Sequence, residues 1–171
     1  MWFQDTYKRG AHPCPCGFRG DSAHDCTCTP PLLQRYRSRL SGPLLDRIDL
    51  HIEVPRVPHK DLTDQEPAES SAVIRQRVNA ARAIQHQRLS PFGLHANSQM
   101  QARHIRRFCK LDEQGDKLIE QVTDKLGLSA RSFTRILKLA RTIADLAESD
   151  SIQTLHLAEA IQYRGVDRKL G

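Results

Sequence analysis

The sequence of 171 residues predicts a mainly α-helical protein, and two observations favour that class. Apolar residues recur every three or four positions through most of the second half, which is the period of an amphipathic helix. Phe, Trp and Tyr together make up only 5% of the chain, which disfavours a large β-sandwich. No apolar run approaches the roughly 20 residues that a membrane-spanning helix needs, so we expect no membrane partner. The length fits one domain or two small ones.

The N-terminal third contains the segments that depart from this helical pattern. Four cysteines and four prolines within residues 13–31 predict an irregular loop that is not held by a hydrophobic core. A helix is expected over residues 32–40, where apolar side chains recur at helical spacing before a Ser-Gly-Pro run ends it. Residues 43–47 then form a short turn or helix. Apolar and polar side chains alternate over residues 48–54, which is the period of a half-buried strand.

The rest of the chain predicts a small helical bundle. Residues 59–69 are polar and lack periodicity, so we expect a linker there. Helices are then expected over five stretches: residues 70–89, 100–108, 112–126, 129–148 and from Thr154 onward. Gly127 is placed to end the third of them, and the fourth has the longest continuous apolar stripe. On the last helix we expect Leu155, Ala158 and Ile161 to be buried.

Positive charge is concentrated in one segment of the chain. The whole chain has a formal net charge of +6. Residues 70–111 contain eight Arg and Lys side chains and no Asp or Glu, so this segment carries +8 and the other 129 residues sum to −2. Such a segment suits contact with a DNA backbone, because basic side chains that neutralise phosphates release counterions. A solvated face or a subunit contact explains the same charge.

Four of the five cysteines form two Cys-x-Cys pairs separated by nine residues: Cys14, Cys16, Cys26 and Cys28. The chain start lacks the basic and apolar regions of a signal peptide, so we expect a cytoplasmic protein whose thiols stay reduced. Four thiolates on two short turns can hold one Zn²⁺ tetrahedrally and order a polar loop. The sequence therefore predicts a structural zinc site. Because the one-residue spacing is tighter than usual, reversible disulfides, or drifted ligand positions with His12 and His24 as substitutes, are alternatives.

The sequence contains no phosphate-binding loop. None of its nine glycines is followed by Lys, so the pattern G-x-x-x-x-G-K-[ST] is missing, as is an apolar run ending in Asp-Glu that could hold Mg²⁺. Two arginines still occupy positions typical of phosphate contacts. Arg47 lies just before the predicted strand, and Arg131 lies in the first turn of the strongest helix, where the macrodipole disfavours a cation unless an anion is nearby. A solvated side chain or a local ion pair is the alternative for each.

Several runs of the sequence resemble one family of AAA+ ATPases. They are HPCPCG at residues 12–17, RYRSRLSGPLLDRIDLH at residues 35–51, LSARS at residues 128–132 and IADL at residues 143–146. Together with the second Cys-x-Cys pair, they resemble the C-terminal part of the ComM/YifB family of magnesium-chelatase-like AAA+ ATPases. The resemblance covers nearly all of residues 13–168, and the run at residues 40–49 is highly specific.

This resemblance implies how the chain is divided and what two of its arginines do. Residues 1–58 are then the last piece of an α/β nucleotide-binding domain, residues 59–69 a linker, and residues 70–171 a helical lid. Arg47 resembles the arginine finger, which reaches a nucleotide on the neighbouring subunit and stabilises the transferring phosphoryl group. Arg131 resembles the sensor 2 arginine, which contacts the γ-phosphate from the lid.

The resemblance also implies ligands and partners. The family forms a homo-hexameric ring, uses ATP with Mg²⁺, and acts on DNA as a helicase that promotes branch migration during natural transformation. Because this chain has neither Walker motif, we expect it to be inactive in ATP hydrolysis by itself.

Two departures from the family point to alternatives. His12 occupies the position of the sensor 1 asparagine, and residues 1–9 do not have the pattern of a buried strand. One hypothesis is therefore a truncated or frame-shifted remnant whose first dozen residues are disordered. A second is a stand-alone zinc-stabilised DNA-binding or adaptor module. A magnesium chelatase that acts on porphyrin comes third, because nothing in the sequence identifies a tetrapyrrole site.

Overall fold

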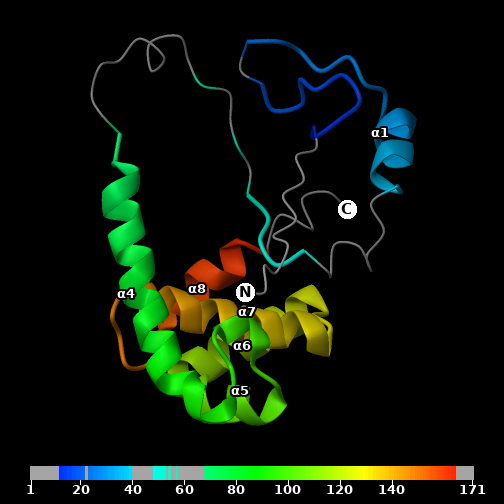
Figure 1. Cartoon of the computed structure of the whole chain (residues 1–171). Coiled ribbons are helices and arrows are strands. Elements are labelled where there is room, and N and C mark those ends of the chain that lie inside the picture. Colours follow the sequence, from blue (N-terminus) through cyan, green and yellow to red (C-terminus); the bar gives the residue numbers. More distant parts are fainter. Residues whose placement is uncertain are drawn as a thin grey trace.

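The computed structural model shows a helical bundle preceded by a cysteine-rich loop and one separate helix (Figure 1). It describes residues 12–21, 23–39, 48–52, 54, 57 and 68–164. The described helices are α1 Pro30–Arg37, α4 Ser71–Leu89, α5 Ala102–Phe108, α6 Glu113–Leu126, α7 Ala130–Leu146 and α8 Thr154–Gln162, with the 3₁₀ turns η1 Ser90–Phe92 and η2 Asn97–Gln99. The mainly α-helical class is confirmed. Residues 1–11, residues 43–47 with Arg47, and most of the predicted linker lie outside the described residues.

Helix α7 lies at the centre of the bundle and contacts α4, α5 and α8. Its buried apolar stripe follows the spacing predicted from the sequence: Ile136, Leu137, Ala140, Ile143 and Ala144. Buried side chains from the neighbouring helices complete the same core: Leu89, Ile105, Ile119 and Leu157. Removing this apolar surface from water, at about 25 cal/mol per Å², is the main source of stability for the bundle.

The helix boundaries are set by capping side chains that the sequence displays. Ser70, Asp112 and Ser129 each accept a hydrogen bond from a backbone N–H in the first turn of the helix that follows. Gly127 ends α6 with φ 49°, in the left-handed region that favours glycine. The predicted starts and ends of α4, α6 and α7 are accordingly confirmed to within a few residues.

A buried polar network ties α4 and η2 to α7. The Asp145 carboxylate accepts hydrogen bonds from both Nη atoms of Arg88, at 2.8 and 2.6 Å, and from Arg141 Nε at 3.1 Å. Asn97 Nδ2 adds a fourth bond, at 2.7 Å. Asp145 is fully buried, so both of its oxygens depend on these partners rather than on water.

Helix α4 packs on the bundle only through its second half. Residues 71–79 are all exposed, whereas Ala81, Gln85 and Leu89 are buried. Figure 1 shows this first half standing out from the bundle. Among the described helices none, α4 included, combines the length and the apolar character needed to cross a bilayer.

The strand predicted over residues 48–54 is wrong for the part that the structure describes. Residues 48–52 and 54 carry no strand, and Leu50, Ile52 and Val54 are exposed. A strand needs a neighbour that supplies ladder hydrogen bonds, and the described residues contain no strand that could serve as one. The alternating pattern therefore has no sheet to join within this part of the chain.

The buried face of α8 also differs from the prediction. Of the three side chains expected to be buried, Leu155 is 61% exposed and the other two are half-buried, whereas His156, Leu157 and Ala160 are buried. This short helix has two adjacent apolar stripes, one with Leu155, Ala158 and Ile161 and the other with Leu157 and Ala160. The spacing of apolar residues alone does not decide which of the two is buried. The structure buries the stripe that contains His156, whose Nδ1 accepts the backbone N–H of Gln153 at 3.1 Å.

Helices α5 and α8 begin with the same cap, Gln-x-x-His. In α5, His104 Nδ1 accepts the backbone N–H of Gln101 at 3.0 Å, as His156 does in α8. Burial lowers the pKa of both histidines below 6.5, and the nearby positive charge of Arg103 or Arg141 lowers it further. The neutral imidazole, whose Nδ1 can accept, is thus the form that the fold favours.

Candidate functional site

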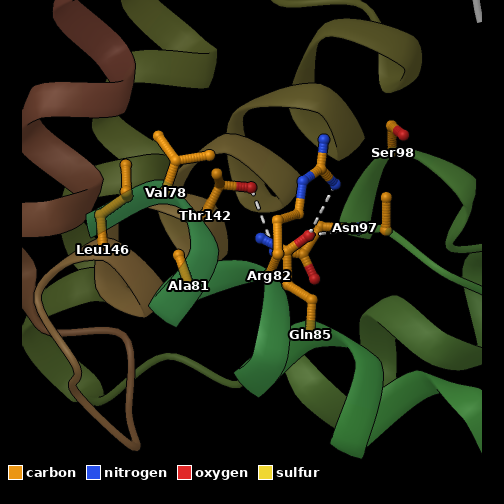
Figure 2. A pocket seen from close by; sticks show the side chains of 9 residues that line it. Val78, Ala81, Arg82, Gln85, Asn97, Ser98, Thr142 and Leu146 are labelled. Carbon is orange, nitrogen blue, oxygen red and sulfur yellow. Dashed lines mark hydrogen bonds between the residues drawn. The ribbon is translucent and has the colours of Figure 1, made fainter. Parts of the chain in front are cut away.

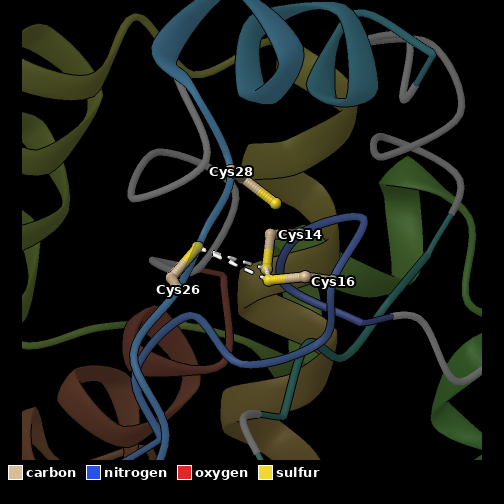
Figure 3. Close-up of side chains that lie close together, drawn as sticks. All are labelled: Cys14, Cys16, Cys26 and Cys28. Atoms are coloured by element: carbon tan, nitrogen blue, oxygen red, sulfur yellow. Dashed lines mark hydrogen bonds between the residues drawn. The ribbon is translucent and has the colours of Figure 1, made fainter.

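The cysteine-rich loop brings four sulfur atoms toward one another (Figure 3). Gly17 closes the first turn, because its N–H donates to the Cys14 carbonyl at 3.1 Å and its φ of 85° lies in the left-handed region. Helix α1 supports the loop through the Tyr36 hydroxyl, which donates to the His12 carbonyl at 3.0 Å. As predicted, the loop is irregular, and local contacts of this kind hold it.

The four sulfur atoms of Cys14, Cys16, Cys26 and Cys28 all lie within 4.8 Å of one another. The Cys14 and Cys16 sulfurs are 3.3 Å apart, and the Cys26 sulfur is 3.7 Å from each of them. Four thiolates around Zn²⁺ at about 2.3 Å each would lie about 3.8 Å apart at the corners of a tetrahedron. The cluster is close to that geometry and can hold a metal ion. Neither His12 nor His24, the alternative ligands, belongs to it.

Backbone N–H groups of the two turns form hydrogen bonds to the sulfur atoms and act to lower the pKa of the thiols. The N–H of Phe18 and the neighbouring thiols lower the pKa of Cys16 to about 6. The N–H of Cys16 also acts to lower the pKa of Cys28, but desolvation and the adjacent thiols outweigh it and raise that pKa to about 12. Peptide N–H groups aimed at sulfur are typical outer-shell partners of metal–thiolate sites. The fifth cysteine, Cys109, is a core thiol instead, and burial raises its pKa to about 11.

Arg131 lies in the first turn of α7, as predicted, and its side chain is exposed. Ser129 caps this turn by accepting the N–H of Ser132 at 3.1 Å. Within the described part of the chain, no carboxylate pairs with Arg131. Its guanidinium therefore adds to the positive end of the α7 macrodipole, and no carboxylate among the described residues compensates it. The structure does not test Arg47, which lies outside the described residues.

A buried arginine that the sequence did not predict binds this turn. Arg164 follows α8 and is only 5% exposed. Its Nη2 donates to the Ser132 hydroxyl at 3.0 Å, and its Nη1 donates to the carbonyl of Ile48. No local pattern signals this role, because the three residues are far apart in the sequence.

Two further contacts attach the segment that begins at Ile48 to the bundle. Asp49 forms an ion pair with Arg135 of α7 at 2.9 Å. The N–H of His51 donates to the carbonyl of Tyr163 at 2.9 Å. The residues that directly follow Arg47 are thus bound to the N-terminal half of α7 and to the end of α8.

Four basic side chains on and just after α5 form a surface that we call the basic surface: Arg103, Arg106, Arg107 and Lys110. The spacing of Arg103, Arg106 and Arg107 puts them on one side of the helix, and Lys110 follows two residues after the helix ends. All four side chains are exposed. None of them pairs with a carboxylate among the described residues. The Arg107 guanidinium lies 5.4 Å from the ring centroid of Phe92 and 5.3 Å from that of Phe108, which holds it by cation–π attraction.

A shallow pocket of about 290 Å³ lies where α4, η2 and α7 meet (Figure 2). Val78 and Leu146 supply its apolar wall, and Asn97 donates to the Thr142 hydroxyl at 3.0 Å on its polar side. Its lining includes none of the predicted site residues. The pocket therefore plays no part in the candidate site.

The bundle and the cysteine loop together define a class of protein. Residues 68–164 match the family described as magnesium chelatase, subunit ChlI C-terminal, and the chain belongs to that family. Residues 9–62 match the family described as magnesium chelatase, subunit ChlI.

Two named relatives narrow this class. Protein YifB of Escherichia coli (strain K12) is 46% identical over 144 residues, which cover 84% of this chain and 28% of that protein. Competence protein ComM of Haemophilus influenzae is 42% identical over 160 residues, which cover 93% of this chain and 30% of that protein. The resemblance to the ComM/YifB family is confirmed. The chain spans less than a third of the length of these relatives.

Proposed function

We propose that this chain is the C-terminal part of a ComM/YifB-type AAA+ ATPase, with Arg47 as its arginine finger and Arg131 as its sensor 2. The observation that carries the proposal is Arg131 itself, exposed and without a paired carboxylate in the described residues, at the start of a helix in a chain of the magnesium chelatase C-terminal family. A phosphate-binding loop and the carboxylates that hold Mg²⁺ would lie outside these 171 residues, because the sequence has neither pattern.

In this proposal residues 1–58 complete a nucleotide-binding domain, residues 59–69 form a linker and residues 70–171 form the lid. ATP with Mg²⁺ supplies the phosphoryl group that is transferred to water. Arg131 binds the γ-phosphate from the lid. Arg47 neutralises charge on the transferring group of ATP bound to the next subunit, an effect worth about 10³ to 10⁵ in rate where it is used. Because that contact crosses an interface, the active form is a ring of identical subunits, which we propose to be a hexamer.

We further propose that the ring moves along DNA and promotes branch migration when incoming single strands are integrated. The support is the name of one relative, a competence protein, together with the exposed basic surface on α5. Basic side chains of this kind neutralise backbone phosphates without regard to base sequence. Such contact is what a protein that travels along DNA requires.

A chimaera tests the ATPase assignment. The matching region of Escherichia coli YifB is replaced by this chain, so that the remainder of YifB supplies the nucleotide cradle. We expect Arg47→Ala to lower ATP turnover by about 10³-fold or more and Arg131→Ala to lower it by about 10²-fold. Arg75→Ala, an exposed arginine on α4, is the matched control and should leave turnover unchanged. Turnover within twofold of the parent in both test variants would refute the assignment.

We propose that the four clustered cysteines bind one structural Zn²⁺. The support is the sulfur spacing of 3.3 to 3.7 Å among Cys14, Cys16 and Cys26, with the Cys28 sulfur within 4.8 Å of each of them. A set of four cysteines without a histidine matches a closed structural site better than a catalytic one. Zinc would contribute folding free energy to a loop that has little apolar core of its own. Protein purified without chelator should contain close to one zinc per chain, and less than about 0.2 per chain would exclude the site.

The second candidate function is a stand-alone zinc-stabilised DNA-binding or adaptor module. The basic surface favours it, because its four side chains have no carboxylate partners among the described residues and need no nucleotide to act. Salt-dependent DNA binding by the isolated chain, unaffected by ATP, would favour this candidate. ATP turnover by the chimaera that depends on Arg47 and Arg131 would favour the first.

A further inference from the structure

One buried arginine joins the two stretches of chain that carry the proposed phosphate contacts. Ile48 is the residue that follows Arg47, and Ser132 is the residue that follows Arg131. Arg164 binds both neighbours, donating from Nη1 to the Ile48 carbonyl and from Nη2 to the Ser132 hydroxyl at 3.0 Å. A single planar guanidinium thus spans two segments that are more than 80 residues apart in sequence.

The chemistry of Arg164 makes this link difficult to break or replace. The side chain is 5% exposed, and a buried cation that loses its acceptors cannot turn to water instead. Guanidinium donors stand in a fixed fork, so binding one acceptor with Nη1 and another with Nη2 fixes the position of each relative to the other. A lysine has a single ammonium on a flexible stem and fixes no such geometry.

Two neighbouring contacts also attach the segment after Arg47 to the bundle. Asp49, two residues after Arg47, pairs with Arg135 at 2.9 Å. Arg135 lies four residues after Arg131, so the two arginines share a face of α7 one turn apart. The N–H of His51 adds a third contact, at 2.9 Å to the carbonyl of Tyr163, the residue before Arg164.

We propose that Arg164 is a positioning residue that holds the segment after Arg47 in register with the first turn of α7, so that the finger and sensor 2 move as one unit. This inference rests on the proposed ATPase function. Arg164 touches no nucleotide itself. Its role is to transmit a displacement of the lid helix to the chain beside the finger.

The first experiment uses the isolated chain and does not depend on nucleotide. Hydrogen exchange is measured by mass spectrometry for peptides that cover residues 48–52 and 129–135. We expect Arg164→Ala and Arg164→Lys to speed exchange at the His51 amide about tenfold or more, and Arg75→Ala to leave it unchanged. Unchanged exchange in both Arg164 variants would overturn the inference. If Arg164→Ala fails to fold, Ser132→Ala removes one acceptor alone and should loosen the same two peptides.

The second experiment uses the YifB chimaera. We expect Arg164→Lys to lower kcat for ATP about 10- to 100-fold with KM within about twofold, because a displacement of about 1 Å in a catalytic group costs this much. In a background that already carries Arg47→Ala and Arg131→Ala, the same change should have no further effect on turnover. A merely structural role would lower turnover equally in both backgrounds and would contradict the inference.

The two experiments separate the failure of the inference from that of the proposed function. If Arg47→Ala and Arg131→Ala leave turnover intact, the ATPase proposal fails, and the inference fails with it, whatever the exchange results. If those changes abolish turnover while Arg164→Lys retains it, only the role of Arg164 is overturned.

Discussion

Replacing Asp145 with asparagine would remove the charge that the buried Arg141 and the partly buried Arg88 share, while keeping the shape of the side chain. The carboxylate accepts four hydrogen bonds, from Arg88, Arg141 and Asn97. An asparagine would keep one acceptor oxygen and place an NH₂ group against donors. Arg141, whose side chain is 3% exposed, would then be a cation in the core whose remaining acceptors among the described residues are the uncharged carbonyls of Ser149 and Asp150.

Removing one partner of a buried ion pair typically costs about 3 to 5 kcal/mol. Arg88 is 16% exposed and reaches some water, so we expect Asp145→Asn to cost about 3 to 4 kcal/mol. Domains of this size are stable by about 5 to 15 kcal/mol in total, so the variant would lose a large share of its stability. Urea unfolding followed by far-UV circular dichroism should show a midpoint lower by about 2 M with an unchanged slope.

The matched control is Glu113→Gln, which breaks the Glu113–Lys117 ion pair of 2.6 Å on the exposed side of α6. That pair is highly exposed, and pairs of this type contribute about 0.5 kcal/mol or less. A loss below about 1 kcal/mol for Asp145→Asn would refute the view that the network holds α4 to α7.

Three further predictions concern the caps, the cysteines and the basic surface. The lowered pKa values of His104 and His156 mean that their contribution to stability is complete above pH about 6.5 and is lost as pH falls through the lowered pKa. Urea midpoints should therefore fall between pH 7.5 and 5, and less so in the double variant His104→Gln, His156→Gln, whose amides cap without titrating. Cys28→Ser should abolish stoichiometric zinc binding but leave the far-UV spectrum of the bundle nearly unchanged; loss of the bundle spectrum would contradict the separation of the loop from the core. The double variant Arg106→Ala, Arg107→Ala should weaken DNA binding measured by fluorescence anisotropy and reduce the steepness of its salt dependence by about two phosphate contacts, and equal slopes for both proteins would rule out the basic surface as the contact.

Local signals predicted most of the fold, because helix ends are decided by neighbouring residues. Ser70, Asp112 and Ser129 cap from one residue before the helix, and Gly127 ends α6 from one residue after it. The apolar stripe of α7 is likewise a local pattern. The strand at residues 48–54 failed for the opposite reason: a strand needs a partner, and no pattern within one segment supplies it.

Long-range polar contacts could not be predicted from the sequence. Asp145 and Arg88 are 57 residues apart, and Arg164 and Ile48 are 116 residues apart. One signal did exist for the first pair, since an acidic side chain in the last turn of α7 opposes the helix macrodipole and so calls for a nearby cation. The cysteine cluster was the easier case: its two pairs lie close in sequence, and all four sulfurs meet as expected.

The free half of α4 has a mechanical consequence. Nine residues, 71–79, stand clear of the bundle as a stiff rod about 13 Å long. The half of α4 that follows this rod is held to α7 by Arg88, which binds the buried carboxylate of Asp145. The tip of the rod is secured against fraying by Ser70 and by the ion pair of Glu69 with Arg77. A tilt of about 10° at the base swings the tip by about 2 Å. The first half of α4 therefore acts as a lever arm: a rotation of the bundle displaces Ser70 and pulls on the chain that precedes it.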